Sequence, residues 1–195
     1  PLLRVLLEES GRGKPVLGIC NGCQVLIEAG LVPGVEPGRI EVALAANRQP
    51  GRRGYLARWV AVAAHPQASS PFVEGLHGSI PLPMAHAEGR FTHEDPARFA
   101  ELAAQGHVAL RYVALGGRAS SNPNGALLDA AALTNRSGNV LAMMPHPERA
   151  AQLRAVPEDL PHAWGARRRQ AAGAAAELEG EGPGTFLLRR LVNLC

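Results

Sequence analysis

Lysine and aromatic side chains are scarce in this sequence. Lys14 is the sole lysine among 20 basic residues, and aromatic residues make up 4% of the 195 residues. The arginines are scattered, whereas single-stranded nucleic acid needs basic grooves lined with aromatic rings on which bases stack. The isolated triplet Arg167-Arg168-Arg169 is more typical of a solvated surface. We therefore expect no nucleic-acid partner.

Cysteine and long apolar runs are also scarce. Cys20, Cys23 and Cys195 show no regular spacing, which argues against a secreted disulfide scaffold. No run approaches the roughly 18 apolar residues of a membrane-spanning helix. The first ten residues include acidic side chains, which a signal peptide lacks. The sequence also contains no G-x-x-x-x-G-K-[ST] motif, the phosphate-binding loop of many ATP sites. These absences predict a cytoplasmic protein that spans no membrane and has no ATP site of its own.

The apolar runs that are present predict an α/β fold in one domain. Short apolar runs bounded by Gly, Pro and Asn read as strands, and amphipathic segments read as helices. The expected strands are 16–19, 39–45, 55–63, 79–84, 109–113 and 140–143, and the expected helices are 1–9, 24–29, 96–105 and 185–194. Residues 151–184 are rich in Ala, Gly, Glu and Arg, which predicts an extended surface segment with some helix around 171–179. The expected architecture is a mixed central sheet flanked by helices.

A cysteine lies where the first expected strand meets a helix. Gly18-Ile19-Cys20-Asn21-Gly22 has the G-x-nucleophile-x-G spacing of a nucleophile elbow, whose tight turn favours glycine on both sides. A thiol beside a helix N-terminus can have a pKa between about 3.5 and 7.5, below the usual value of about 8.5. The backbone N–H of Asn21 could help to stabilise an oxyanion there.

Two other interpretations of this turn stay open from its residues alone. Cys20-Asn21-Gly22-Cys23 is also a C-x-x-C, as in redox proteins that place the pair between a strand and a helix. Alternatively, both cysteines are small apolar core residues. The elbow spacing by itself does not decide between them.

A histidine and a carboxylate follow the last expected strand, in Met144-Pro145-His146-Pro147-Glu148-Arg149. The prolines are expected to keep this segment extended, so that His146 and Glu148 point to the same side. An imidazole can activate a thiol, and a carboxylate can orient the imidazole. Together with the elbow, the pair favours Cys20 as the nucleophile of a triad.

Three stretches carry a resemblance to a known family: GKPVLGICNGCQ, IPLPMAHAEGRF and LTNRSGNVLAMMPHPERA. They resemble class I, triad-type glutamine amidotransferases, and within these the glutaminase subunits of phosphoribosylformylglycinamidine synthases of purine biosynthesis. The resemblance covers about residues 13–150. It implies a flavodoxin-like amidotransferase domain over 1–195, with 151–184 as a surface insertion. It also implies a missing N-terminal part, because a first strand and a glycine-rich loop that donates a second oxyanion N–H would precede Pro1.

The resemblance assigns roles residue by residue. It implies that Cys20 is the nucleophile, His146 the general base and Glu148 its orienting partner. Gln24 matches a glutamine that helps to hold substrate, although a solvent-facing helix position is the alternative. The stretch with His86 and Gly89 would lie beside the substrate, with Ala87 where the family usually has glycine. Cys23 stands where the family often has an apolar residue, which predicts a core position.

The activity that the resemblance implies is hydrolysis of L-glutamine to glutamate and ammonia. Ammonia would pass to a synthetase (PurL-like) subunit, which would bind ATP and magnesium, and a small accessory (PurS-like) subunit would complete the complex. No metal or cofactor is implied for this chain. The alternatives are another amidotransferase or cysteine hydrolase with a different acceptor, and a catalytically silent binding partner.

Overall fold

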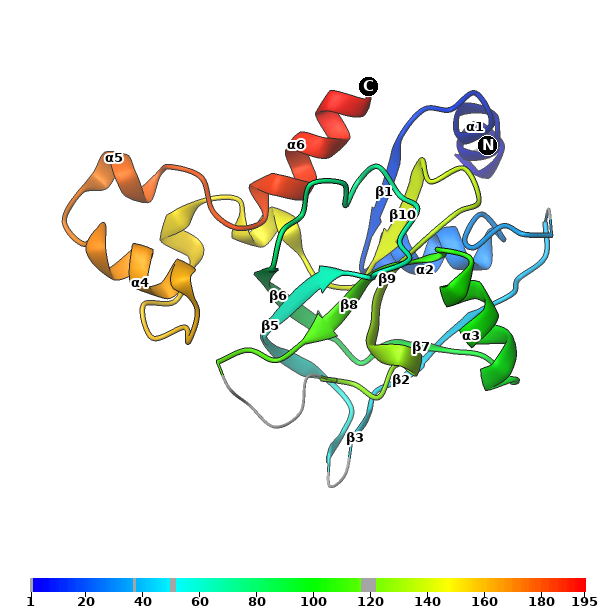
Figure 1. Ribbon diagram of the computed structural model, residues 1–195, viewed down its shortest axis with the longest axis horizontal. Coiled ribbons are helices and arrows are strands. Elements are labelled where there is room, and N and C mark those ends of the chain that lie inside the picture. Colours follow the sequence, from blue (N-terminus) through cyan, green and yellow to red (C-terminus); the bar gives the residue numbers. More distant parts are fainter. Residues whose placement is uncertain (1, 37, 50–51, 117–121) are drawn as a thin grey trace.

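The structure is a computed structural model that describes residues 2–36, 38–49, 52–116 and 122–195. A six-stranded sheet in the order β1-β10-β9-β8-β5-β6 forms its centre (Figure 1). The strands of this sheet are β1 (Val16–Ile19), β5 (Leu56–Ala64), β6 (Ser79–His86), β8 (Val108–Val113), β9 (Ala130–Thr134) and β10 (Val140–Met143). Two small sheets pair β2 (Ala43–Ala46) with β7 (Glu88–Thr92), and β3 (Arg48–Gln49) with β4 (Arg52–Arg53).

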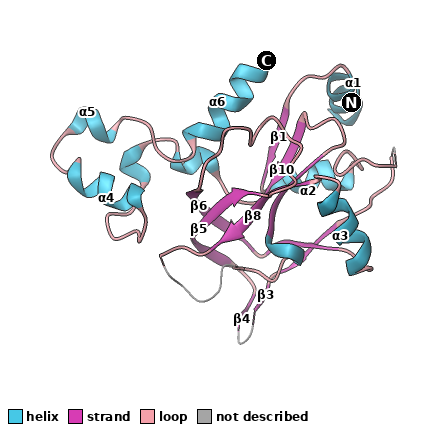
Figure 2. Ribbon diagram, in the orientation of Figure 1, coloured by secondary structure: helices cyan, strands magenta, loops and turns pink. Residues whose placement is uncertain are grey.

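The central sheet is mixed, as the sequence predicts. β1 and β10 are parallel, with Ile19 opposite Met143, and the other neighbouring strands are antiparallel. Figure 2 shows the strands of the sheet in magenta and the helices around them in cyan. Alternate residues of β10 face opposite sides, so that Ala142 joins one core cluster and Leu141 the other. Both faces of the sheet are therefore buried.

Helices cover both faces. On one face lie α2 (Asn21–Glu28) and α3 (Pro96–Ala104), and on the other lies α6 (Thr185–Leu194). α2 buries Cys23, Leu26 and Ile27, the i, i+3, i+4 stripe of an amphipathic helix. α3 begins at Pro96, and the Asp95 carboxylate accepts a 2.9 Å hydrogen bond from the backbone N–H of Ala97. α1 (Leu2–Gly11) precedes β1 at the sheet edge.

Three strands, β9, β7 and β2, differ from the sequence-based expectation. β9 is alanine-rich and buried at every residue, so its sequence shows no alternation that would predict a strand. β7 forms where no strand is expected, and the expected strand 39–45 is shorter, since β2 begins at Ala43. β7 becomes a strand because it pairs with β2. These two segments are separate in the sequence, so only the folded chain shows the pairing.

Residues 151–184 fold more than the expected extended segment. They form α4 (Ala163–Gln170), α5 (Ala175–Leu178) and the short 3-10 turn Leu153–Ala155, and in Figure 1 both helices lie beyond the β5–β6 end of the sheet. A small cluster buries Leu153, Val156, Leu160 and Ala171 against Ala61 of β5. Within the described ranges no helix is long and apolar enough to cross a membrane.

Candidate active site

Cys20 stands at the turn between β1 and α2. Its backbone has φ 51° and ψ −104°, a conformation that costs about 1–3 kcal/mol for a residue with a side chain. The Cys20 N–H donates to the Met143 carbonyl at 2.9 Å, and the Cys20 carbonyl accepts from the Gln24 N–H at 3.1 Å. The half-buried thiol donates to the carbonyl of Ala85 at 3.8 Å. The turn therefore holds the sulfur between the ends of β1, β10 and β6.

Of the two elbow glycines, close packing requires Gly18 but not Gly22. A Cβ at Gly18 would lie 2.7 Å from the Gly22 carbonyl oxygen and 2.4 Å from Leu26 Cδ1, so β1 and α2 need glycine at this position to approach. A Cβ at Gly22 would meet nothing within 4 Å. The expectation that the turn requires glycine on both sides is wrong for Gly22, because its α-carbon faces open space.

α2 begins directly after Cys20. Asn21, its first residue, has a backbone N–H without an intrahelical acceptor, as do the next N–H groups of the first turn. Such groups carry partial positive charge, which favours a thiolate or an oxyanion nearby. The position of Asn21 thus suits the oxyanion role predicted for its N–H.

Cys23 is fully buried in the core between α2 and the sheet. Burial, and then the negative charge of a Cys20 thiolate, raise the pKa of the Cys23 thiol well above its usual value. Cys20, Cys23 and Cys195 are all free thiols. The prediction that Cys23 is a core residue is confirmed, and Cys20 is the partly exposed thiol at the turn.

His146 lies shortly after the end of β10, and Cys20 lies directly after the end of β1. The two strands are parallel neighbours, and the ends of such strands meet at one sheet edge, where binding sites collect. The His146 N–H donates to the Pro83 carbonyl of β6 at 2.8 Å. The His146 Nδ1 lies 2.6 Å from Glu148 Oε1. The buried Nε2 has no hydrogen-bond partner within the described part of the chain, which leaves it available for a proton from substrate or thiol.

The route by which His146 and Glu148 meet differs from the predicted one. Pro147–Ala150 is a 3-10 turn rather than an extended segment, and its first turn brings the Glu148 carboxylate back to the imidazole. The Glu148 side chain is 44% exposed and also lies 3.5 Å from Arg149 Nε. Water and Arg149 therefore screen the carboxylate that holds the histidine.

Gln24 and the β6–β7 segment, residues 85–89, complete the surroundings. The Gln24 Nε2 donates to the Glu88 carbonyl at 3.2 Å in an exposed contact, so this side chain reaches across to the segment at the protein surface. The structure thus places Gln24 beside the elbow.

His86 and Gly89 pack against each other. A Cβ at Gly89 would lie 2.3 Å from the His86 ring and 2.6 Å from Met144, so the ring occupies the space that glycine leaves. Burial, with a smaller contribution from His146, lowers the pKa of His86 to about 4. Neither ring nitrogen has a hydrogen-bond partner among residues whose structure is described. His86 is thus a neutral, buried neighbour of His146, and its predicted contact with substrate stays a prediction.

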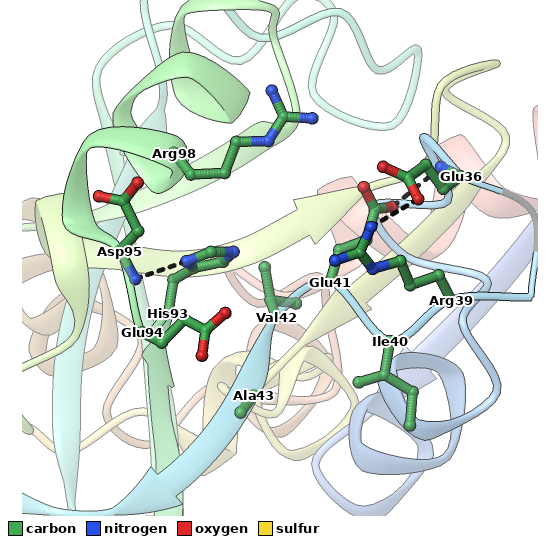
Figure 3. A pocket seen from close by; sticks show the side chains of 10 residues that line it. All are labelled: Glu36, Arg39, Ile40, Glu41, Val42, Ala43, His93, Glu94, Asp95 and Arg98. Carbon is green, nitrogen blue, oxygen red and sulfur yellow. Dashed lines mark hydrogen bonds and ion pairs between the residues drawn. The ribbon is translucent and has the colours of Figure 1, made fainter.

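A separate cleft of about 530 Å³ lies at the far ends of β2 and β7 (Figure 3). Its walls come from Glu36, residues 39–43, residues 93–95 and Arg98. Arg39 is paired with Glu36 at 2.7 Å and Arg98 with Glu101 at 2.8 Å, so both arginines already have acidic partners. No group of the Cys20 turn lines this cleft. No cluster of three or more His, Cys, Asp or Glu in the described ranges is arranged to hold a metal.

Sequence reasoning missed two residues beside the site, Asn47 and Asn124. Both are buried, and their side-chain amides donate to the β6–β7 segment. Asn124 belongs to the motif Asn122-Pro123-Asn124-Gly125, which reads as a turn without indicating what the turn contacts.

Comparison with known proteins shows similarity over most of the chain. The family model of the CobB/CobQ-like glutamine amidotransferase domain matches residues 6–171. The PurQ subunit of phosphoribosylformylglycinamidine synthase from Trichormus variabilis is 41% identical over 152 residues, which are 77% of this chain and 59% of the relative. The PurQ subunit of Methanosarcina mazei is 41% identical over 154 residues, 78% of this chain and 62% of the relative. The chain thus spans about 60% of the length of these relatives.

A solved structure resembles the fold as well. PurLQS from Thermotoga maritima superimposes with a TM-score of 0.64 at 27% identity, covering 98% of this chain and 67% of that chain. The mixed sheet flanked by helices is the expected flavodoxin-like amidotransferase architecture. With a family model that matches most of its length, this chain belongs to the CobB/CobQ-like glutamine amidotransferase domain family.

Proposed function

We propose that this chain carries the glutaminase site of a phosphoribosylformylglycinamidine synthase. The observation that carries the proposal is the arrangement of Cys20 and the His146–Glu148 pair at the ends of adjacent parallel strands. The names of the PurQ relatives support glutamine as the substrate and amidine synthesis as the use of its nitrogen.

The chemistry follows from the three side chains. His146 Nε2 first takes the proton of the Cys20 thiol. The thiolate then attacks the side-chain amide carbon of glutamine, and the N–H of Asn21 stabilises the oxyanion. His146 Nε2 gives its proton to the departing ammonia as the carbon–nitrogen bond breaks, which leaves a glutamyl thioester on Cys20. Water then attacks the thioester, with His146 accepting its proton, and glutamate leaves as the thiol is restored.

Glu148 and Gln24 support these steps in different ways. The 2.6 Å contact of Glu148 with His146 Nδ1 fixes the tautomer that leaves Nε2 facing the reaction, and it stabilises the imidazolium that forms. Gln24, tied to the Glu88 carbonyl, is proposed to hold the substrate with His86 and Gly89 beside it.

The partners are part of the same proposal. The names of the PurQ relatives and of the similar PurLQS structure support a PurL-like synthetase that receives the ammonia, and a PurS-like accessory subunit is proposed beside it. ATP and magnesium would bind to the synthetase. Residues 1–195 would act as one amidotransferase domain, with 151–184 as a surface insertion, in the cytoplasm, where free thiols such as Cys20 stay reduced.

The test uses a glutamine-mimicking electrophile and glutaminase rates on the protein with its synthetase partner. Cys20→Ala is expected to abolish both labelling and hydrolysis. Cys23→Ala serves as the matched control, because this thiol is buried away from the turn, and it should retain labelling and most activity. Equal loss in both variants, with a disulfide forming between the two cysteines in the wild type, would replace the proposal by a redox function.

A further inference from the structure

The β6–β7 segment has an unusual set of hydrogen bonds. Five consecutive carbonyls, from residue 85 to residue 89, each accept a bond from outside the segment. The donors are Cys20 Sγ to Ala85 at 3.8 Å, Asn47 Nδ2 to His86 at 2.7 Å, Asn47 N to Ala87 at 2.8 Å, Gln24 Nε2 to Glu88 at 3.2 Å and Asn124 Nδ2 to Gly89 at 2.8 Å.

These donors come from two sides. Cys20 and Gln24 belong to the elbow and to α2, and they are the groups proposed to attack and to hold substrate. Asn47 and Asn124 come from loops elsewhere in the chain, 39 and 35 residues away from the residues they bind. The same short segment therefore connects the reacting groups to a pair of asparagines that do not reach the thiol.

Both asparagines are buried. Asn47 Nδ2 also donates to the Gly54 carbonyl at 3.0 Å, whereas Asn47 Oδ1 has no partner among the described residues. Asn47 is 3% exposed and Asn124 is 0% exposed. The Asn124 Oδ1 accepts from the N–H of Ala126, and the Asn124 carbonyl accepts from the N–H of Arg48 at 2.9 Å. Because the groups facing both Nδ2 atoms are carbonyl oxygens, which only accept, the orientation of each amide is determined.

Loss of either amide would leave a buried carbonyl without its partner. An unsatisfied buried acceptor costs about 1–3 kcal/mol, so the segment would move to recover a hydrogen bond. Any such movement shifts the Ala85 and Glu88 carbonyls, against which the Cys20 thiol and the Gln24 amide rest. A displacement of about 1 Å at reacting groups can cost up to about 100-fold in rate.

We propose that Asn47 and Asn124 are positioning residues of the glutaminase site. They hold the β6–β7 segment at the distance from Cys20 and Gln24 at which a glutamine side chain fits. This inference rests on the proposed function of the Cys20 site.

The test compares Asn47→Asp and Asn124→Asp with a matched control, Asn139→Asp. Each change replaces a donor by a carboxylate oxygen of the same shape, which faces a carbonyl oxygen it cannot bind. Asn139 is also buried, and its Nδ2 donates to the carbonyls of Ser10 and Lys14, both at 2.9 Å. Those bonds lie where α1 leads into β1, at the end of the strand away from Cys20.

We expect the two segment variants to lose about 10- to 100-fold in kcat/KM for glutamine relative to the control. The rate at which a glutamine-mimicking electrophile labels Cys20 should fall in parallel. Labelling by iodoacetamide, a small reagent that needs no held side chain, should change far less. Where the aspartate variants do not fold, Asn47→Ala and Asn124→Ala carry the same comparison.

Three results decide the matter. A lower ratio of glutamine-like to iodoacetamide labelling in the segment variants alone supports the inference. The same ratio in all variants, with thermal destabilisation equal to that of Asn139→Asp, assigns both asparagines to stability only and overturns it. A wild-type protein that neither hydrolyses glutamine nor labels at Cys20 overturns the proposed function itself. This result concerns the wild type alone, so it is distinct from any difference between the variants and the control.

Discussion

The elbow glycines allow a sharp test of the packing between β1 and α2. A Cβ added at Gly18 would lie 2.7 Å from the backbone oxygen of Gly22 and 2.4 Å from Leu26 Cδ1. Leu26 can adopt another rotamer, but a helix backbone atom moves only if α2 moves. Overpacking of this kind costs about 1–3 kcal/mol. Gly18→Ala should therefore destabilise the protein and displace Cys20, which begins the turn into that helix.

Gly22→Ala is the matched control, because its Cβ meets nothing within 4 Å. Gly22 is the second residue of α2, and replacing glycine by alanine in a helix gains up to about 1 kcal/mol. For a domain of this size we expect Tm to fall by roughly 2–12 °C in Gly18→Ala and to stay constant or rise in Gly22→Ala. Calorimetry measures the change in Tm, and the rate of Cys20 alkylation measures the displacement of the cysteine. If the two variants show equal losses, the close approach at Gly18 is not what positions the cysteine.

Two further predictions concern the histidines. Glu148→Gln keeps the shape of the side chain but removes its charge, and we expect kcat for glutamine to fall about 10- to 100-fold. This loss is smaller than the roughly 10⁴-fold seen for a buried orienting aspartate, because Glu148 is 44% exposed. An unchanged kcat would remove Glu148 from the triad. The pKa of His86 is about 4 when folded, against 6.5 for an unperturbed histidine, so the unfolded chain takes up the proton first and stability falls as pH drops from about 6.5 toward 4. His86→Gln should flatten this loss in denaturant titrations between pH 7 and 4.5, and parallel curves for the two proteins would contradict the burial of a neutral imidazole.

Several elements follow from local sequence. The strand Val16–Ile19 and the helix Thr185–Leu194 have the predicted bounds, because each shows its own apolar pattern between clear breakers. The elbow spacing and the His-x-Glu pair likewise lie within a few residues of sequence. Short-range chemistry of this kind can be predicted because the groups that must meet are already neighbours in the chain.

Other features depend on distant residues. β9 reads as alanine-rich and becomes a strand because β8 and β10 pair with it on both sides. The sequence favours Cys20 over Cys23 as the reactive thiol, and the complete burial of Cys23 is seen only in the packing of α2 on the sheet.

The sequence by itself determined the α/β class, the nucleophile elbow and the histidine–carboxylate pair, since each is a local pattern with a direct physical meaning. The tertiary structure alone decided that Gly18 and not Gly22 is sterically required, and that Pro147–Ala150 turns rather than extends. It also decided that Asn47 and Asn124 hold the segment beside Cys20. A side-chain amide can donate to any carbonyl, and the fold alone selects which carbonyl, 35 or more residues away, lies within its reach.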